Sequence, residues 1–153
     1  MSDGTPSPPR RRALGTVFLT ILLDLIGFGM ILPLLPFYAQ ELDATPFQIG
    51  LLFASYSLAQ LAFAPLLGRV SDRAGRRPVL LASILGSCGA YVLFWAAGSY
   101  ALLLVARTLS GVAASNYGIA QAYVADVTPP EGRSKAMGLV GAAFGLGFII
   151  GPA

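Results

Sequence analysis

Two ionisable side chains interrupt long apolar stretches of this sequence, and they are the first candidates for chemistry. Asp24 lies in the apolar run that begins at residue 13, and Arg107 lies in the run that begins at residue 100. A charge near the centre of a bilayer costs roughly 2.5–3.5 kcal/mol, so such residues face a polar cavity or a charged partner. The pair could orient two helices, bind a substrate or carry a proton. We favour the functional interpretation and assign both residues to proton and substrate coupling.

A second group of charges lies at residues 68–78, with the sequence GRVSDRAGRRP. Gly75 suits a tight turn that needs a positive φ, and Pro78 suits the first turn of a following helix. A simple positive anchor would accept any mixture of Lys and Arg and would need no acidic residue. Asp72 among the arginines therefore predicts a salt-bridge network that fixes two helix ends in one arrangement.

The elements that position these residues follow from composition. The chain is 56% hydrophobic and 11% charged, whereas soluble domains carry about 25% charged residues. Its apolar runs each supply about 20 positions, the length that a helix needs to cross a bilayer core, and backbone groups in lipid must be satisfied internally. We predict an all-α membrane protein with a disordered cytoplasmic tail over 1–12. The predicted transmembrane helices, about five, cover 13–39, 47–67, 79–97, 100–125 and 136–153.

The basic residues predict the orientation of these helices. Nine of the ten Lys and Arg residues fall in the tail, in 68–78 and in the link after residue 125. If the helices alternate in direction, these three segments share one side, and Lys and Arg mark the cytoplasmic side. We therefore expect a multi-pass protein of the cell membrane with a cytoplasmic N-terminus. Counting 1.5 Å per residue then places Asp24 and Arg107 within about one helical turn of each other in depth.

Other polar and small residues add detail to the predicted helices. Gln60, Asn116 and Gln121 are candidates to line a cavity. Small residues at a spacing of four predict close packing of helices, and Pro152 removes an amide donor and kinks the last helix. The small residues are Gly141, Gly145, Gly147 and Gly151 in the last run, and Ala114, Gly118 and Ala122 in the fourth.

Five stretches carry a resemblance to a known family. GRVSDRAGRRP resembles the signature cytoplasmic loop of the major facilitator superfamily, with the complete pattern Gly-x-x-x-Asp-Arg-x-Gly-Arg-Arg. RTLSGVAAS, 107–115, is similar to the family's helix-4 motif, an Arg followed four residues later by Gly. GLGFIIGPA, 145–153, is similar to the helix-5 motif of its proton-driven antiporters. Residues 22–39 and 122–133 look most like the tetracycline/proton antiporter branch of drug exporters, and the resemblance covers 13–153.

The resemblance implies a fold and a set of site residues. Family members have about twelve helices in two halves, each built from inverted three-helix repeats, so this chain would be an incomplete N-terminal half of a longer protein. In this reading Asp72, Arg76 and Asp126 form a charge relay that latches the halves in the outward-facing state. The implied loop residues are Gly68, Asp72, Arg73, Gly75, Arg76 and Arg77, and the implied helix-5 residues are Gly147, Gly151 and Pro152. Ala90 stands where tetracycline exporters carry Asp before a tyrosine, which argues against tetracycline itself.

Other classes of function fit the sequence poorly. The chain has no histidine and one cysteine, which excludes His-based catalytic triads and metal sites made of several His or Cys residues. We therefore expect no enzyme activity, catalytic residue, metal or cofactor, and the net charge of +3 needs no nucleic acid to explain it.

We predict a secondary active transporter that exchanges protons for a small amphiphilic, drug-like solute and takes its energy from a proton gradient. Its partners would be that solute, the lipid bilayer and the missing C-terminal half of the same protein. A transporter of the same fold that imports sugars or metabolites remains an alternative, as does a membrane scaffold segment.

Overall fold

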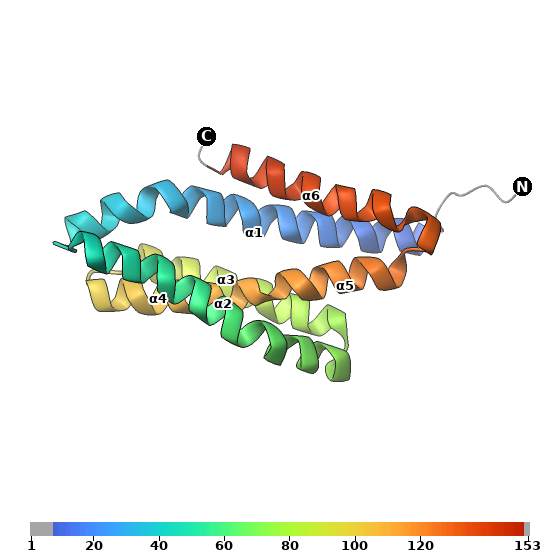
Figure 1. The fold of residues 1–153 in the computed structure, drawn as a ribbon, viewed down its shortest axis with the longest axis horizontal. Coiled ribbons are helices and arrows are strands. Elements are labelled where there is room, and N and C mark those ends of the chain that lie inside the picture. Colours follow the sequence, from blue (N-terminus) through green and yellow to red (C-terminus); the bar gives the residue numbers. More distant parts are fainter. Residues whose placement is uncertain (1–7, 152–153) are drawn as a thin grey trace, which may run out of the picture.

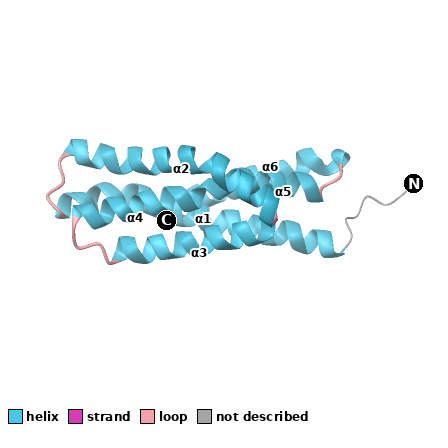
Figure 2. Ribbon diagram, turned by 90° about the horizontal axis from the view of Figure 1, so that it is seen from below, coloured by secondary structure: helices cyan, strands magenta, loops and turns pink. Residues whose placement is uncertain are grey.

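The computed structural model describes residues 8–151, and helices make up nearly all of this part (Figure 1). The elements in chain order are α1 (Pro8–Glu41), α2 (Pro46–Ala74), α3 (Arg76–Trp95), α4 (Tyr100–Ala113), the 3₁₀ helix η1 (Ala114–Asn116), α5 (Tyr117–Val127), the 3₁₀ helix η2 (Pro130–Gly132) and α6 (Arg133–Ile150). Residues 8–151 contain no strand, as Figure 2 also shows. The prediction of an all-α fold is confirmed.

The helices run back and forth along one common axis (Figure 1). The start of α1, the α2–α3 junction and the α5–α6 junction lie at one end, and the α1–α2 and α3–α4 junctions lie at the other. α1 and α6 lie side by side, and α5 continues the path of α4 (Figure 1). The charged segment 68–78 and the α5–α6 link therefore share one end of the bundle, which we call the charged end.

Within residues 8–151, four helical segments are long and apolar enough to cross a membrane. They are Ile21–Glu41, Pro46–Ala74, Arg76–Trp95 and Pro130–Ile150. They correspond to the first, second, third and fifth of the predicted spans. The fourth differs, because the helix expected over 100–125 is divided into α4, η1 and α5.

Side-chain hydrogen bonds surround the interruption at η1. The hydroxyl of Ser115 donates to the backbone carbonyl of Gly111 at 3.1 Å, and side-chain hydrogen bonds of this kind compete with the regular helical ladder. A 3₁₀ segment in the middle of a helix often marks a functional hinge. We therefore correct the prediction of one continuous fourth helix.

Several helix boundaries also differ from the predicted ones. α1 begins at Pro8, so residues 8–12 are helical and do not belong to a tail, and proline is favoured at the first helical position. α2 continues past residue 67 to Ala74. The predicted boundary marked the end of the apolar run, and the helix continues through the charged residues that follow it. α6 begins at Arg133, three residues before the predicted start at 136. Residues 1–7 and the C-terminal Pro152 and Ala153 lie outside the described part of the chain.

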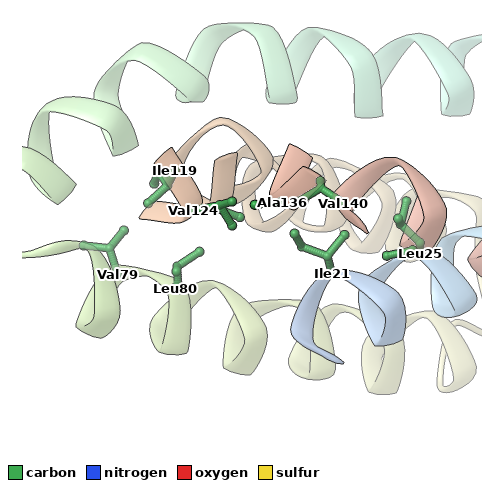
Figure 3. Close-up of a cluster of buried hydrophobic side chains, with 10 residues drawn as sticks. Ile21, Leu25, Val79, Leu80, Ile119, Val124, Ala136 and Val140 are labelled. Atoms are coloured by element: carbon green, nitrogen blue, oxygen red, sulfur yellow. The ribbon is translucent and has the colours of Figure 1, made fainter. Parts of the chain in front are cut away.

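Two apolar clusters hold the bundle together. The first lies toward the charged end and joins α1, α3, α5 and α6; Figure 3 shows its side chains Ile21, Leu25, Val79, Leu80, Ile119, Val124, Ala136 and Val140. The second lies toward the opposite end and joins α1, α2 and α4 with the segment after α3; its buried members are Ile31, Leu35, Ala39, Leu52, Ala97 and Leu103. Asp24 lies between Ile21 and Leu25 of the first cluster. Phe28 lies between the two clusters along α1, and Arg107 follows Leu103 of the second cluster along α4.

Glycines bring α1 and α6 into close contact. A Cβ atom added to Gly147 would lie 2.5 Å from Leu25 Cβ, and one added to Gly151 would lie 2.7 Å from the backbone oxygen of Ile26. A Cβ at Gly29 on α1 would in turn meet the carbonyl oxygen of Gly147 at 3.0 Å. The two backbones therefore approach so closely that only glycine fits at these positions.

Candidate functional site

A cavity of about 180 Å³ lies inside the bundle and borders the first apolar cluster at Ile21 and Leu25. Residues from α1, α2, α3, α4, η1, α5 and α6 line it, so it is formed by the fold as a whole. Its polar lining residues include Asp24, Tyr56, Gln60, Ser87, Arg107 and Asn116. Both intramembrane charges singled out in the sequence thus border the same space.

Arg107 is almost completely buried, with 1% of its surface exposed. Its guanidinium carbon lies 4.3 Å from the centre of the Tyr56 ring and 5.5 Å from the centre of the Phe28 ring. A third ring, Phe53, lies at 5.9 Å. Aromatic faces attract a cation, and this partly offsets the cost of burying the charge. Arg107 Nε has no hydrogen-bond partner within the described residues.

Gly111 explains why Tyr56 can cover Arg107. A Cβ atom at Gly111 would overlap the backbone carbonyl group of Tyr56, so α2 and α4 approach each other at this point without a side chain between them. Arg107 lies one helical turn before Gly111 on the same helix face. The Arg-x-x-x-Gly spacing therefore places the guanidinium against an aromatic ring of the neighbouring helix.

Asp24 is held from two other helices. The amide of Asn116 donates to Asp24 Oδ2 at 3.0 Å, and the hydroxyl of Tyr91 donates to the backbone oxygen of Asp24 at 3.3 Å. Gly27 makes room for this tyrosine, because a Cβ atom there would lie 2.7 Å from the Tyr91 ring. Within residues 8–151, Asp24 and Arg107 form no ion pair with each other. The cavity thus has an acidic and a basic group that do not neutralise each other by contact.

Gln60 ties α2 to the η1 turn in both directions. Its side-chain amide donates to the carbonyl oxygen of Ala114 at 3.2 Å, and its own backbone oxygen accepts a hydrogen bond from Ser115 Oγ at 3.2 Å. Of the three predicted cavity residues, Gln60 and Asn116 line the cavity. Gln121 is half-buried and is not among the lining residues.

Arg76 joins two carboxylates at the charged end of the bundle. Its Nε lies 2.6 Å from Asp126 Oδ2, and its Nη1 lies 3.4 Å from Asp72 Oδ1. The arginine side chain is 25% exposed, and the side chains of Asp72 and Asp126 are 64% and 57% exposed. Exposed ion pairs contribute only about 0–1 kcal/mol, so this network links the end of α5 to the α2–α3 junction more than it stabilises the fold.

The remaining residues of the charged segment surround this network. Gly75 has a φ of 94°, a conformation that glycine adopts freely, and Pro78 Cδ lies 3.7 Å from the position of its missing Cβ. Arg73 and Arg77 are exposed, and Gly68 is half-buried with open space at its Cβ position.

The small residues predicted to pack helices divide into two groups. Gly147 and Gly151 lie against α1, whereas Gly141, Gly145 and Gly118 have no atom within 4 Å of their Cβ positions in this structure. Close packing was therefore wrongly predicted for these last three within the described residues. Pro152 lies outside that part of the chain.

Sequence reasoning missed part of the aromatic lining. Phe28 and Phe144 border the cavity, as does Ser87 of α3. Phe28 follows Asp24 by four residues, which places both on one helix face, so its position was available from the sequence. Ser87 and Phe144 carry no such signal, because their approach depends on how distant helices pack.

Comparisons with known proteins identify relatives of this chain. The sequence profile of the Major Facilitator Superfamily matches residues 17–153. The chain is 38% identical to the tetracycline resistance protein, class C, of Escherichia coli over 92% of this chain and 36% of the relative. It is 44% identical to the class B protein of Escherichia coli over 86% of this chain and 33% of the relative. It is also 34% identical to the human major facilitator superfamily domain-containing protein 10, over 95% of this chain and 38% of the relative. The chain thus spans about a third of the length of the curated relatives it matches.

Proposed function

The chain belongs to the major facilitator superfamily, and from this premise we propose that it is the first part of a proton-coupled antiporter that exports a small amphiphilic solute. The observation that carries the proposal is the central cavity, which Asp24 and Arg107 both line without pairing with each other. Buried charges are costly in a membrane and mark substrate or proton pathways.

Asp24 is the proton carrier in this proposal. A nearby arginine favours the ionised form of a carboxyl group, and a dry apolar setting favours the protonated form. Asp24 borders a cavity that contains Arg107 and several aromatic rings, so a change in hydration during transport would shift it between the two forms. A solute that binds to the ionised form competes with the proton, and this competition couples the two movements.

The relatives support export as the direction of transport. Those with 37–44% identity include tetracycline resistance proteins of classes B, C, D, E, G and H. Ala90, at 2% exposure, occupies the position where the resemblance leads one to expect an aspartate. We therefore propose export of an amphiphilic aromatic solute and do not assign tetracycline.

The charged end supplies the conformational latch. We propose that this end is cytoplasmic, because it carries the α2–α3 junction with four arginines and the α5–α6 link with Arg133 and Lys135. The ion pairs of Arg76 with Asp72 and Asp126 would hold the outward-facing state. A second half of the same protein would complete the cavity, since alternating access moves one half against the other.

Proteoliposomes that contain the full-length protein and a pH-sensitive dye in the lumen test this proposal. A panel of amphiphilic aromatic solutes of each charge type is added, and lumenal pH and solute uptake are recorded together. We expect at least one solute to move against a counterflow of protons, with Asp24→Asn inactive and Arg69→Lys active. Solute movement that is indifferent to the proton gradient and to Asp24→Asn would reject the proposal.

A further inference from the structure

Arg107 has a buried hydrogen-bond donor without an acceptor among the described residues. Its side chain is 1% exposed, borders the cavity, and its Nε has no hydrogen-bond partner within the described residues. An arginine stays charged in proteins. The faces of the surrounding rings attract this charge, but they cannot accept the two parallel N–H hydrogen bonds that a carboxylate accepts. A planar oxyanion is the group that matches a guanidinium in both charge and geometry.

Asp24 offers hydrogen-bond acceptors in the same cavity. One of its oxygens accepts the amide hydrogen of Asn116, and an ionised carboxylate has about four acceptor positions. Within residues 8–151 no cation pairs with it. A substrate ammonium group would therefore find an open acceptor there, and it would compete with a proton for the same oxygens.

Aromatic rings line the cavity that holds both charges. Phe28 and Tyr56 have ring centres 5.1 Å apart, and Tyr117 and Phe144 form an edge-to-face pair at 5.4 Å. All four line the cavity of about 180 Å³. An apolar cavity of about 150 Å³ can hold benzene, so this space accommodates one aromatic ring with small substituents.

We propose that the cavity binds a zwitterionic aromatic solute, with its carboxylate on Arg107, its ring among these aromatic side chains and its ammonium group on Asp24. This inference rests on the proposed function and names the substrate class of the same site. A purely cationic solute would leave Arg107 without an acceptor and would add a like charge to the cavity. A purely anionic solute would add a like charge near Asp24 and would not compete with the proton. Only the zwitterion satisfies both groups and keeps the exchange with a proton.

Four related compounds test the proposal by equilibrium binding to the purified full-length protein. They are 4-(aminomethyl)benzoic acid, its methyl ester, its N-acetyl derivative and the doubly blocked N-acetyl methyl ester, which are zwitterionic, cationic, anionic and neutral. Hydrogen bonds to charged groups are worth enough to change affinity about tenfold or more. We expect the zwitterion to bind about tenfold more tightly than either singly charged compound, and the neutral compound to bind most weakly.

Three variants assign each preference to one side chain. Arg107→Gln should abolish the preference for a free carboxylate and keep the preference for a free amine, and Asp24→Asn should do the reverse. Arg107→Lys keeps the charge but loses the planar fork, so it should weaken the carboxylate preference without removing it. Leu109→Met, on the exposed side of α4, is the control and should bind all four compounds as the wild type does.

The outcomes separate this inference from the proposed function, because binding is measured without a proton gradient. If the carboxylate preference survives Arg107→Gln at full strength, a group other than Arg107 binds the carboxylate and the proposal is wrong. Equal affinity for the cation and the zwitterion would also overturn it, as would no binding of any of the four compounds to folded wild-type protein. Proton-coupled export of another solute could stand in each of these cases.

Discussion

The side-chain amide of Asn116 lies 3.0 Å from the carboxylate of Asp24, and this hydrogen bond joins the η1 turn to the middle of α1 across 92 positions of sequence. The contact connects the 3₁₀ turn that interrupts the fourth helix directly to the carboxyl group that we propose as the proton carrier. A movement of the η1 turn therefore changes the surroundings of Asp24. A change in the charge of Asp24 in turn changes the strength of the hydrogen bond from Asn116.

Variants at Asp24 test its role in coupling. Asp24→Asn should stop proton-driven transport while the protein still folds, because it removes the ionisable group with little change in shape. Asp24→Glu should keep part of the activity. The measurement is solute-driven proton flux in proteoliposomes, with size-exclusion profiles as the check on folding. Full coupled flux in Asp24→Asn would contradict the assignment.

Asn116 should act on transport more than on stability. Asn116→Ala removes the hydrogen bond to Asp24, and we expect coupled flux to fall several-fold while the yield of folded protein stays near normal. Asn116→Ser keeps a hydrogen-bond donor and should retain more activity than Asn116→Ala. Flux equal to wild type in both variants would show that the hydrogen bond plays no part in transport.

Gly111 should be sensitive to a single added methyl group. Gly111→Ala would force α2 and α4 apart at the Tyr56 backbone, and overpacking of this kind typically costs about 1–3 kcal/mol. Gly118→Ala is the matched control, because its Cβ position is open and alanine favours a helix over glycine. Thermal unfolding of the full-length protein in detergent should show a lower midpoint for Gly111→Ala only. Equal midpoints would mean that the contact is more compliant than the structure indicates.

The contact between α1 and α6 should act as a seal. Gly147→Ala would place a methyl group against Leu25, so we expect a higher passive proton leak across proteoliposomes. Gly145→Ala on the same helix meets no atom and serves as the control. The leak is measured as the decay of an imposed pH gradient without solute, and identical decay in the two variants would argue against a sealing role.

Two variants at the charged end distinguish a role in transport from a role in membrane topology alone. Asp72→Asn should abolish most transport with near-normal expression, because it breaks an exposed ion pair of Arg76 that contributes little to stability. Arg69→Lys keeps the positive charge at the same end and should be mild. If transport tolerates Asp72→Asn as well as Arg69→Lys, the segment acts only as a topological anchor.

The sequence predicted the helical class, but not the details of the site. Counting along straight helices brings Asp24 and Arg107 to one level, and the structure has both in the cavity lining. It could not show that Tyr56 covers Arg107, because that depends on how closely α2 and α4 approach at Gly111. The extension of α2 to Ala74 was missed for a different reason: apolar composition reports where a helix is in lipid, not where it ends.

The order in which the chain is made bears on how the interrupted fourth helix enters the membrane. A 3₁₀ turn at membrane depth needs partners for the backbone groups that the regular ladder leaves free. The side-chain amide of Gln60 donates to the backbone oxygen of Ala114, and Asp24 accepts from the side-chain amide of Asn116 and so fixes the end of the turn. Both of these residues precede the turn, so they are synthesised and inserted before Ala114–Asn116 leave the ribosome. The residues that hold the η1 turn therefore come before it in the order of synthesis.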